Sequence, residues 1–221
     1  MTPTDKSQAC VNIGCGTTPT PGWINFDNSM SLRLSRSPVT ARLLSILRLP
    51  SQSQRETIEF HRTSGVRWAN AVKRIPMENE SVRCVYTSHM VEHLDPSEFR
   101  AFLAEARRVL APGGILRIGV PDLRLLVDEY LRAGDANHFI ESTLLTASRP
   151  IGLIGAVKAL IVGPRHHLWM YDGPSISKEL EANHFVDVLI VPAGETTCAD
   201  PGELNLFERA HQTVYVEATR V

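Results

Sequence analysis

Two glycines and an acidic residue near the start of the chain have a spacing suited to ligand binding. Gly14 and Gly16 follow a short apolar run, and Asp27 ends a second apolar run eleven residues after Gly16. Glycines let backbone amides approach a ligand closely, and a carboxylate at the end of the next strand can accept both hydrogen bonds of a ribose diol. The pattern favours a nucleotide-containing cofactor, and a tight structural turn is the alternative.

The fingerprint of a dinucleotide-binding loop does not fit these residues. Its third glycine would fall at position 19, which is occupied by Pro19. Its acidic residue is expected about 20 residues after the glycines, much later than Asp27. An NAD-binding fold is therefore disfavoured.

Strand and helix patterns alternate along the chain, which predicts an α/β fold with a doubly wound sheet. Apolar runs rich in β-branched residues predict strands at 9–14, 23–27, 64–71, 82–88, 115–122, 185–192 and 211–221. Apolar residues at helical spacing predict helices at 37–49, 95–110, 123–134 and 175–183. Asp95 is expected to cap the second of these helices and Gly134 to end the third. No helical segment separates the last two strands, so we expect them to pair antiparallel.

Composition indicates one folded domain. Of the 221 residues, 43% are hydrophobic and 21% are charged, which excludes a disordered, collagen-like or coiled-coil chain. The four cysteines show no C-x-x-C spacing and no histidine pattern suited to zinc, so we expect neither a disulfide framework nor a metal site. A net charge of -1 and an aromatic content of 6% argue against a nucleic-acid partner.

Two segments stand out from the regular pattern of the single domain expected over 1–221. The region around 30–60 is predicted to be a basic helical insertion, and basic residues outnumber acidic ones from 28 to 74. The region around 138–173 contains an apolar run, which favours a lid or an interface such as a homodimer contact. Together they suggest an anionic or lipid-linked substrate. No run is long enough to span a bilayer and no signal sequence is visible, so we expect a cytoplasmic protein, with peripheral membrane contact as a further option.

Five strings in order along the chain resemble the class I S-adenosylmethionine-dependent methyltransferases. More narrowly, they resemble a small bacterial subgroup associated with sugar and surface-polysaccharide biosynthesis. The strings are "VNIGCG", "IPMENESVRCVYTSHMVEHL", "EARRVLAPGGILRIGVPDL", "HLWMYD" and "TVYVEA". The resemblance implies a mostly parallel, seven-stranded sheet with an antiparallel last strand. It also implies S-adenosylmethionine as cofactor and S-adenosylhomocysteine as product.

The resemblance assigns a set of cofactor-binding residues. Gly14, Cys15 and Gly16 match the cofactor loop, Asp27 the ribose-binding acid, and Asn70 the residue facing adenine. The full set is Asn12, Gly14, Cys15, Gly16, Asp27, Asn70, Ala71, Thr87, Ser88 and His89. The chain departs from the family at Thr18, which replaces the third glycine, and at Asn70, which replaces an aspartate. The first helix must also be shortened or absent.

Several side chains suit activation of an acceptor hydroxyl, which benefits from a base within hydrogen-bond reach. The catalytic candidates are His89, Asp122, His167 and Tyr171, with His166 and Asp172 beside them. We hypothesise that His167 is the base. Asp122 equally suits a helix cap, and Tyr171 with Asp172 a turn. Glu92 and His93 are interpreted as residues that start a helix rather than as a proton relay.

The sequence therefore predicts a methyltransferase that O-methylates a sugar or glycan precursor. One alternative is a methyltransferase of a small lipid or quinone, favoured by the apolar segment. Another is a non-catalytic protein that binds S-adenosylmethionine, which the departures at Thr18 and Asn70 leave open. No metal ion enters any of these predictions.

Overall fold

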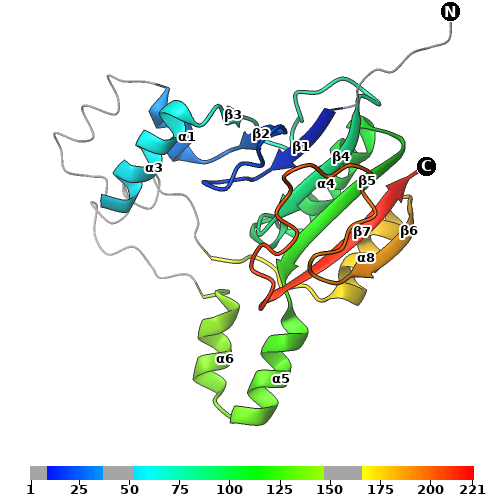
Figure 1. Cartoon of the computed structure of the whole chain (residues 1–221). Helices are drawn as coiled ribbons and strands as arrows, with labels where there is room; N and C mark the ends of the chain where they lie inside the picture. Colours follow the sequence, from blue (N-terminus) through cyan, green and yellow to red (C-terminus); the bar gives the residue numbers. More distant parts are fainter. Residues whose placement is uncertain (1–8, 37–51, 147–165) are drawn as a thin grey trace, which may run out of the picture.

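A seven-stranded sheet organises the protein (Figure 1). The computed structural model describes residues 9–36, 52–146 and 166–221. The strand order is β3-β2-β1-β4-β5-β7-β6, and β7 runs antiparallel to both of its neighbours while the other pairs are parallel. The strands are β1 (Ala9–Ile13), β2 (Ile24–Asp27), β3 (Arg67–Trp68), β4 (Val82–Ser88), β5 (Leu110–Pro121), β6 (Phe185–Val191) and β7 (Thr213–Arg220). The predicted α/β sheet with an antiparallel last strand is confirmed.

Six α-helices and one 3-10 helix lie between these strands in the described parts of the chain. They are α1 (Met30–Ser35), α3 (Gln52–Thr63), η1 (Val91–His93), α4 (Pro96–Val109), α5 (Leu123–Ala133), α6 (Ala136–Thr143) and α8 (Gly173–Ala182). As predicted, Asp95 caps α4 and Gly134 ends α5 in a left-handed conformation. The sequence predicted no bounds for α1, α3 or α6, but α1 and most of α3 lie in the segment around 30–60 that was predicted to be a basic helical insertion. The helix predicted at 37–49 lies outside the described residues, as do 147–165 of the predicted apolar insertion.

The hydrophobic core lies between the sheet and the helices α4 and α8. The buried face of α4 carries Phe99, Phe102, Leu103, Ala106 and Val109, which is the apolar stripe read from the sequence. No helix of the described residues is both long and apolar enough to cross a membrane.

The connection between β1 and β2 contains turns and no helix, which confirms the prediction that the first helix is shortened or absent. The long connection between β6 and β7 runs back along the sheet (Figure 1). There Arg83 on β4 donates to the carbonyls of Ala199 and Asp200, and Trp23 donates to the carbonyl of Pro201. This connection is therefore hydrogen-bonded both to β4 and to the residue that precedes β2.

A buried ion pair fixes the start of the same connection. Arg117 on β5 and Glu217 on β7 are 0% and 1% exposed in their side chains, and Nη1 of Arg117 lies 2.6 Å from Oε1 of Glu217. Arg117 also donates to the carbonyl of Glu195, and Glu217 accepts from the hydroxyls of Thr196 and Thr197. Burial raises the pKa of Glu217, but these hydrogen bonds outweigh it and lower the pKa below its ordinary value.

Candidate functional site

The predicted cofactor residues lie at or near the carboxyl ends of the parallel strands β1, β2, β3 and β4, where α/β sheets bind ligands. Gly14 has a φ of +72°, and a Cβ added there would lie 2.6 Å from Cγ of Met90. The amide of Gly14 donates to the carbonyl of Phe26, which ties the loop to β2. Gly14 is thus required both by its backbone conformation and by the close approach of Met90.

Asp27 is held by the loop that it faces. Its Oδ2 accepts a hydrogen bond from the amide of Gly16 over 3.0 Å, and its Oδ1 accepts one from the amide of Ser29 over 2.7 Å. A carboxylate offers about four acceptor positions, so each oxygen keeps one for a ligand hydroxyl. The arrangement fits a ribose diol.

Asn12 and Cys15 support the loop from within. Asn12 is buried and donates to the hydroxyl of Thr20, whose amide in turn donates to Asn25. Burial, followed by the charge of Asp27, raises the pKa of Cys15 to about 12, so this residue remains a neutral thiol. Both residues are buried, and their contact with a cofactor stays a prediction.

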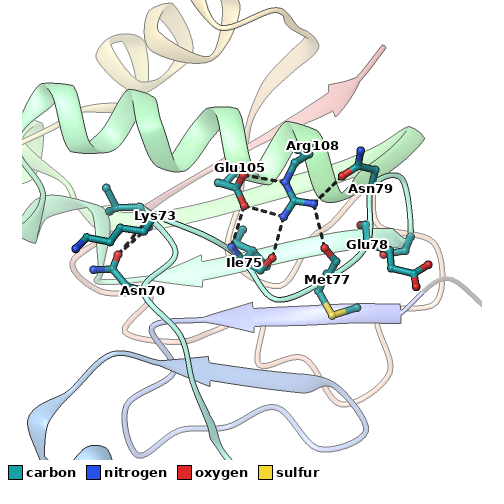
Figure 2. Close-up of polar contacts among 10 residues, drawn as sticks. Asn70, Lys73, Ile75, Met77, Glu78, Asn79, Glu105 and Arg108 are labelled. Carbon is teal, nitrogen blue, oxygen red and sulfur yellow. Dashed lines mark hydrogen bonds and ion pairs between the residues drawn. The ribbon is translucent and has the colours of Figure 1, made fainter.

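Asn70 lies in the connection between β3 and β4 (Figure 2). Its Oδ1 accepts from the amides of Val72 and Lys73, so the side chain caps a turn that also contains the buried Ala71. Glu105 and Arg108 on α4 hold the following residues: Glu105 accepts from the amide of Ile75, and Arg108 donates to its carbonyl. Hydrogen bonds between the backbone of this connection and two side chains of α4 thus hold it in place.

The end of β4 carries polar groups that are buried. Thr87 is 0% exposed, and its Oγ1 has no hydrogen-bond partner within the described ranges. It lies beside Gly14, 4.0 Å from the position that a Cβ would take there. A buried hydroxyl without a partner is unusual in a folded protein, and a bound ligand would satisfy it. Ser88 follows it and is also buried.

His89 follows directly in a left-handed conformation, with a φ of +50° that a residue other than glycine rarely adopts. Its Nε2 lies 2.9 Å from Oγ1 of Thr213, and its Nδ1 lies 3.4 Å from Oε1 of Glu92. Such strain costs about 1–3 kcal/mol and is typical of functional sites.

His167 reaches the same carboxylate from a segment far along the chain. Its Nε2 lies 4.0 Å from Oε1 of Glu92, and its Nδ1 lies 2.8 Å from the carbonyl of Thr143. The amides of Leu168 and Trp169 donate to the backbone carbonyl of Glu92, which docks this segment on η1. Burial lowers the pKa of His167 below its ordinary value of 6.5, and this effect exceeds the rise that the charge of Glu92 causes. The imidazole of His167 is therefore neutral at pH 7.

Asp122 and Tyr171 are paired with each other in a single β-bridge. Asp122 caps α5 by accepting from the amide of Arg124, and burial raises its pKa. Tyr171 lies in the hydrophobic core with its ring 5.4 Å from that of Phe99, and burial raises its pKa. Asp122 caps a helix, which is one of the two roles that the sequence left open, and the ring of Tyr171 packs in the core. The catalytic role of either residue stays a prediction.

Glu92 and His93 are the site residues that sequence reasoning missed. Glu92 is 1% exposed, and the rings of His93 and His167 lie 5.1 Å apart. The two residues do sit in a short helix, but they also complete a cluster with His89 and His167. The spacing H-x-x-E-H from His89 to His93 was the available signal, because residues three and four apart share one side of a helical turn.

An open pocket lies where α1 and α3 end. Its lining includes three arginines, Arg36, Arg62 and Arg67, together with His61. This pocket falls in the region that the sequence marked as basic.

Comparison with known proteins places this geometry in a family context. Residues 11–118, just under half of the chain, match the family model described as a methyltransferase domain. An uncharacterised 37.1 kDa protein of a Streptomyces fradiae transposon is 42% identical over 60 residues, which are 27% of this chain and 16% of that protein. The chain therefore spans a small part of that relative.

Solved methyltransferase structures are similar to this chain at low sequence identity, and the first of the two below shares its fold. An S-adenosylmethionine-dependent methyltransferase from Methanosarcina mazei is 14% identical with a TM-score of 0.50, covering 99% of this chain and 94% of that one. A methyltransferase from Thermotoga maritima, described as a possible histamine N-methyltransferase, is 17% identical with a TM-score of 0.48, covering 96% and 82%. Residues 11–118 are thus similar to a methyltransferase domain, and the seven-stranded, mostly parallel sheet with its antiparallel last strand has the class I methyltransferase fold.

Proposed function

We propose that the chain is an S-adenosylmethionine-dependent methyltransferase that methylates a hydroxyl of a sugar or glycan precursor. The observation that carries the proposal is the carboxylate of Asp27, fixed by the amides of Gly16 and Ser29 at the carboxyl edge of the sheet. The match of this segment to a methyltransferase domain supports it.

The residues at this edge suit the parts of the cofactor. Asp27 would accept the ribose hydroxyls, Asn70 and Ala71 would contact the adenine, and Thr87 with Ser88 would contact the methionine part. The buried hydroxyl of Thr87, without a partner among the described residues, is the observation of fit on that side. When bound, S-adenosylmethionine supplies an electrophilic methyl group, and the protein contributes mainly positioning.

His89 is the base that the geometry favours for the acceptor hydroxyl. It precedes Met90 in the chain, and Met90 packs against Gly14 of the cofactor loop. Its Nδ1 faces Glu92, whose charge would stabilise the imidazolium after Nε2 has taken the proton. Nε2 is hydrogen-bonded to the hydroxyl of Thr213, and the acceptor hydroxyl would replace this partner. His167 is the alternative base, because its Nε2 faces the same carboxylate.

Polar side chains around the cluster favour a hydroxyl-rich acceptor, and the arginine-lined pocket suits an anionic group such as a phosphate on it. One observation favours a second candidate, a small lipid or quinone. The antiparallel helices α5 and α6 project from the sheet (Figure 1) and expose several large apolar side chains. These are Leu125, Tyr130, Leu131 and Ile140. A homodimer contact through the segment around 138–173 and peripheral membrane binding stay predictions.

The experiment measures release of S-adenosylhomocysteine with three sets of acceptors: nucleotide-sugars, lipid-linked sugar phosphates and reduced quinones. Turnover with a sugar acceptor is expected, and His89→Ala should lower it by about 100-fold or more while binding of S-adenosylhomocysteine is retained. His167→Ala tests the alternative base, and His138→Ala on the exposed side of α6 is the control. Turnover only with quinones would replace the sugar by the second candidate, and cofactor binding without turnover on any acceptor would favour the non-catalytic protein.

A further inference from the structure

Glu92 is a buried carboxylate whose charge is not balanced by a close partner. Its side chain is 1% exposed, and neither oxygen accepts a hydrogen bond within the described part of the chain. The nearest basic atoms are Nδ1 of His89 at 3.4 Å and Nε2 of His167 at 4.0 Å. Burial of an unpaired carboxylate is costly unless a cation or a set of donors compensates for it. The surroundings therefore call for a positive charge next to Glu92.

Backbone carbonyls fix the tautomers of His93 and His167, two of the histidines near Glu92. Nδ1 of His167 lies 2.8 Å from the carbonyl of Thr143, and Nδ1 of His93 lies 3.0 Å from the carbonyl of His166. Because a carbonyl only accepts hydrogen bonds, both Nδ1 atoms must carry the proton. Each Nε2 then has a free lone pair. A ring N–H donated to a carbonyl is the usual way in which proteins orient a histidine that ligates a metal ion.

The three side chains converge on one point. Each of Glu92, His93 and His167 offers one ligand atom, and these three atoms all lie within 4.8 Å of one another. Ligands about 2.1 Å from a zinc ion are roughly 3.4 Å apart in a tetrahedron, so side-chain shifts on the order of 1 Å would complete the site. Two imidazoles and a carboxylate suit zinc, cobalt, iron or manganese, whereas magnesium and calcium prefer sites made of oxygen.

We infer that Glu92, His93 and His167 form a binding site for one divalent transition-metal cation. The site goes beyond the proposed function, since it adds a cation beside Glu92, the carboxylate that His89 faces. Three protein ligands leave at least one coordination position open, as in catalytic rather than structural metal sites. An acceptor oxygen bound at that position would be held beside His89, whose Nδ1 faces the same carboxylate.

The test uses the whole chain, freed of metal by dialysis against a chelator. Cobalt is titrated and followed by its visible absorption, which reports coordination, and zinc binding is measured by calorimetry. One cation per chain is expected. Glu92→Gln and His93→Ala should each weaken binding by more than about 100-fold. The matched control pair is Glu129→Gln and His138→Ala, an exposed glutamate and histidine whose facing atoms lie 3.4 Å apart.

Folding is checked in every variant by circular dichroism, because Glu92 is buried. If Glu92→Gln fails to fold, His93→Ala decides alone, since His93 is only partly buried. A wild-type protein that binds no cation, or variants that bind it as tightly as the wild type, would overturn the inference. Binding of S-adenosylhomocysteine is measured in the same samples without metal. If S-adenosylhomocysteine does not bind, the proposed function is contradicted, while the metal titration still decides whether the cation site exists.

Discussion

The amide of Gly16 donates a hydrogen bond to Oδ2 of Asp27 over 3.0 Å, so the glycine loop and the acid at the end of β2 form one unit. Gly16 has a φ of +51°, which directs its amide in a way that other residues rarely allow. The short, helix-free connection from β1 to β2 thus places the acid directly against the loop. This contact explains why Asp27 follows the glycines so closely in the sequence.

Gly14→Ala is expected to disrupt the loop more than a glycine substitution with similar backbone strain. The new Cβ would lie 2.6 Å from Cγ and 2.8 Å from Cβ of Met90. Gly22→Ala is the matched control, because its φ of +76° is close to the +72° of Gly14 and it has open space around it. In both variants, the left-handed backbone conformation should lower the free energy of unfolding by about 1–2 kcal/mol.

The collision with Met90 should add about 1–3 kcal/mol for Gly14→Ala alone. Urea unfolding gives the two free energies. Equal losses in both variants would show that Met90 does not restrict the loop.

Glu105→Gln should destabilise the protein at neutral pH and have little effect in acid. The hydrogen bond from Arg108 lowers the pKa of Glu105 below its ordinary value of 4.5. A lowered pKa means that the carboxylate stabilises the fold at pH values above 4.5 and that this contribution is lost as the pH falls through the pKa of the folded state. The difference in unfolding free energy between wild type and variant should therefore shrink below pH 4.5.

The control for this titration is Glu59→Gln, which removes an exposed ion pair with Arg62 at the same i,i+3 spacing. Exposed pairs contribute little, so this variant should follow the wild type at every pH. A pH-independent loss in Glu105→Gln would mean that packing rather than charge holds the connection to Ile75.

Arg117→Met should cost about 3–5 kcal/mol, because it leaves Glu217 as a buried charge without its cation. The side chain of Arg117 is fully buried, and its loss also removes the bond to the carbonyl of Glu195. Arg124→Met removes the cation of the exposed pair with Asp128 and serves as the control. Chemical unfolding of both variants makes the comparison, and similar small losses would show that Glu217 is neutral in the folded protein.

Local patterns in the sequence predicted the parts of the fold and site that depend on neighbouring residues. The cap at Asp95, the helix end at Gly134 and the turn at Gly14 each follow from one short stretch of chain. The mostly parallel, seven-stranded sheet with an antiparallel last strand followed from the family resemblance and is confirmed. Strand and helix boundaries were less accurate: β5 begins at Leu110, before the predicted 115, because Leu110 already pairs with Val82 on β4 and the register shifts only after this pair.

Contacts between distant segments could not be predicted in this way. Glu92 looks like an ordinary polar residue of a short helix until the amides of Leu168 and Trp169 dock on its carbonyl. Arg117 and Glu217 are separated by 100 residues, and nothing near either residue indicates the partner. Tyr171 belongs to a string that resembles a family motif, yet its ring fills the core because Phe99 on α4 lies against it.

The most direct test of the central claim is calorimetric titration of S-adenosylhomocysteine into the wild type, Asp27→Ala and the control Asp128→Ala. Asp128 is an exposed carboxylate on α5, far from Asp27 in the sequence. Loss of hydrogen bonds to a charged group costs about 1.5–3 kcal/mol, so Asp27→Ala should bind roughly 10- to 100-fold more weakly. Asp128→Ala should bind like the wild type. Unchanged affinity in Asp27→Ala, with its fold intact, would contradict the assignment of this edge of the sheet as the cofactor site.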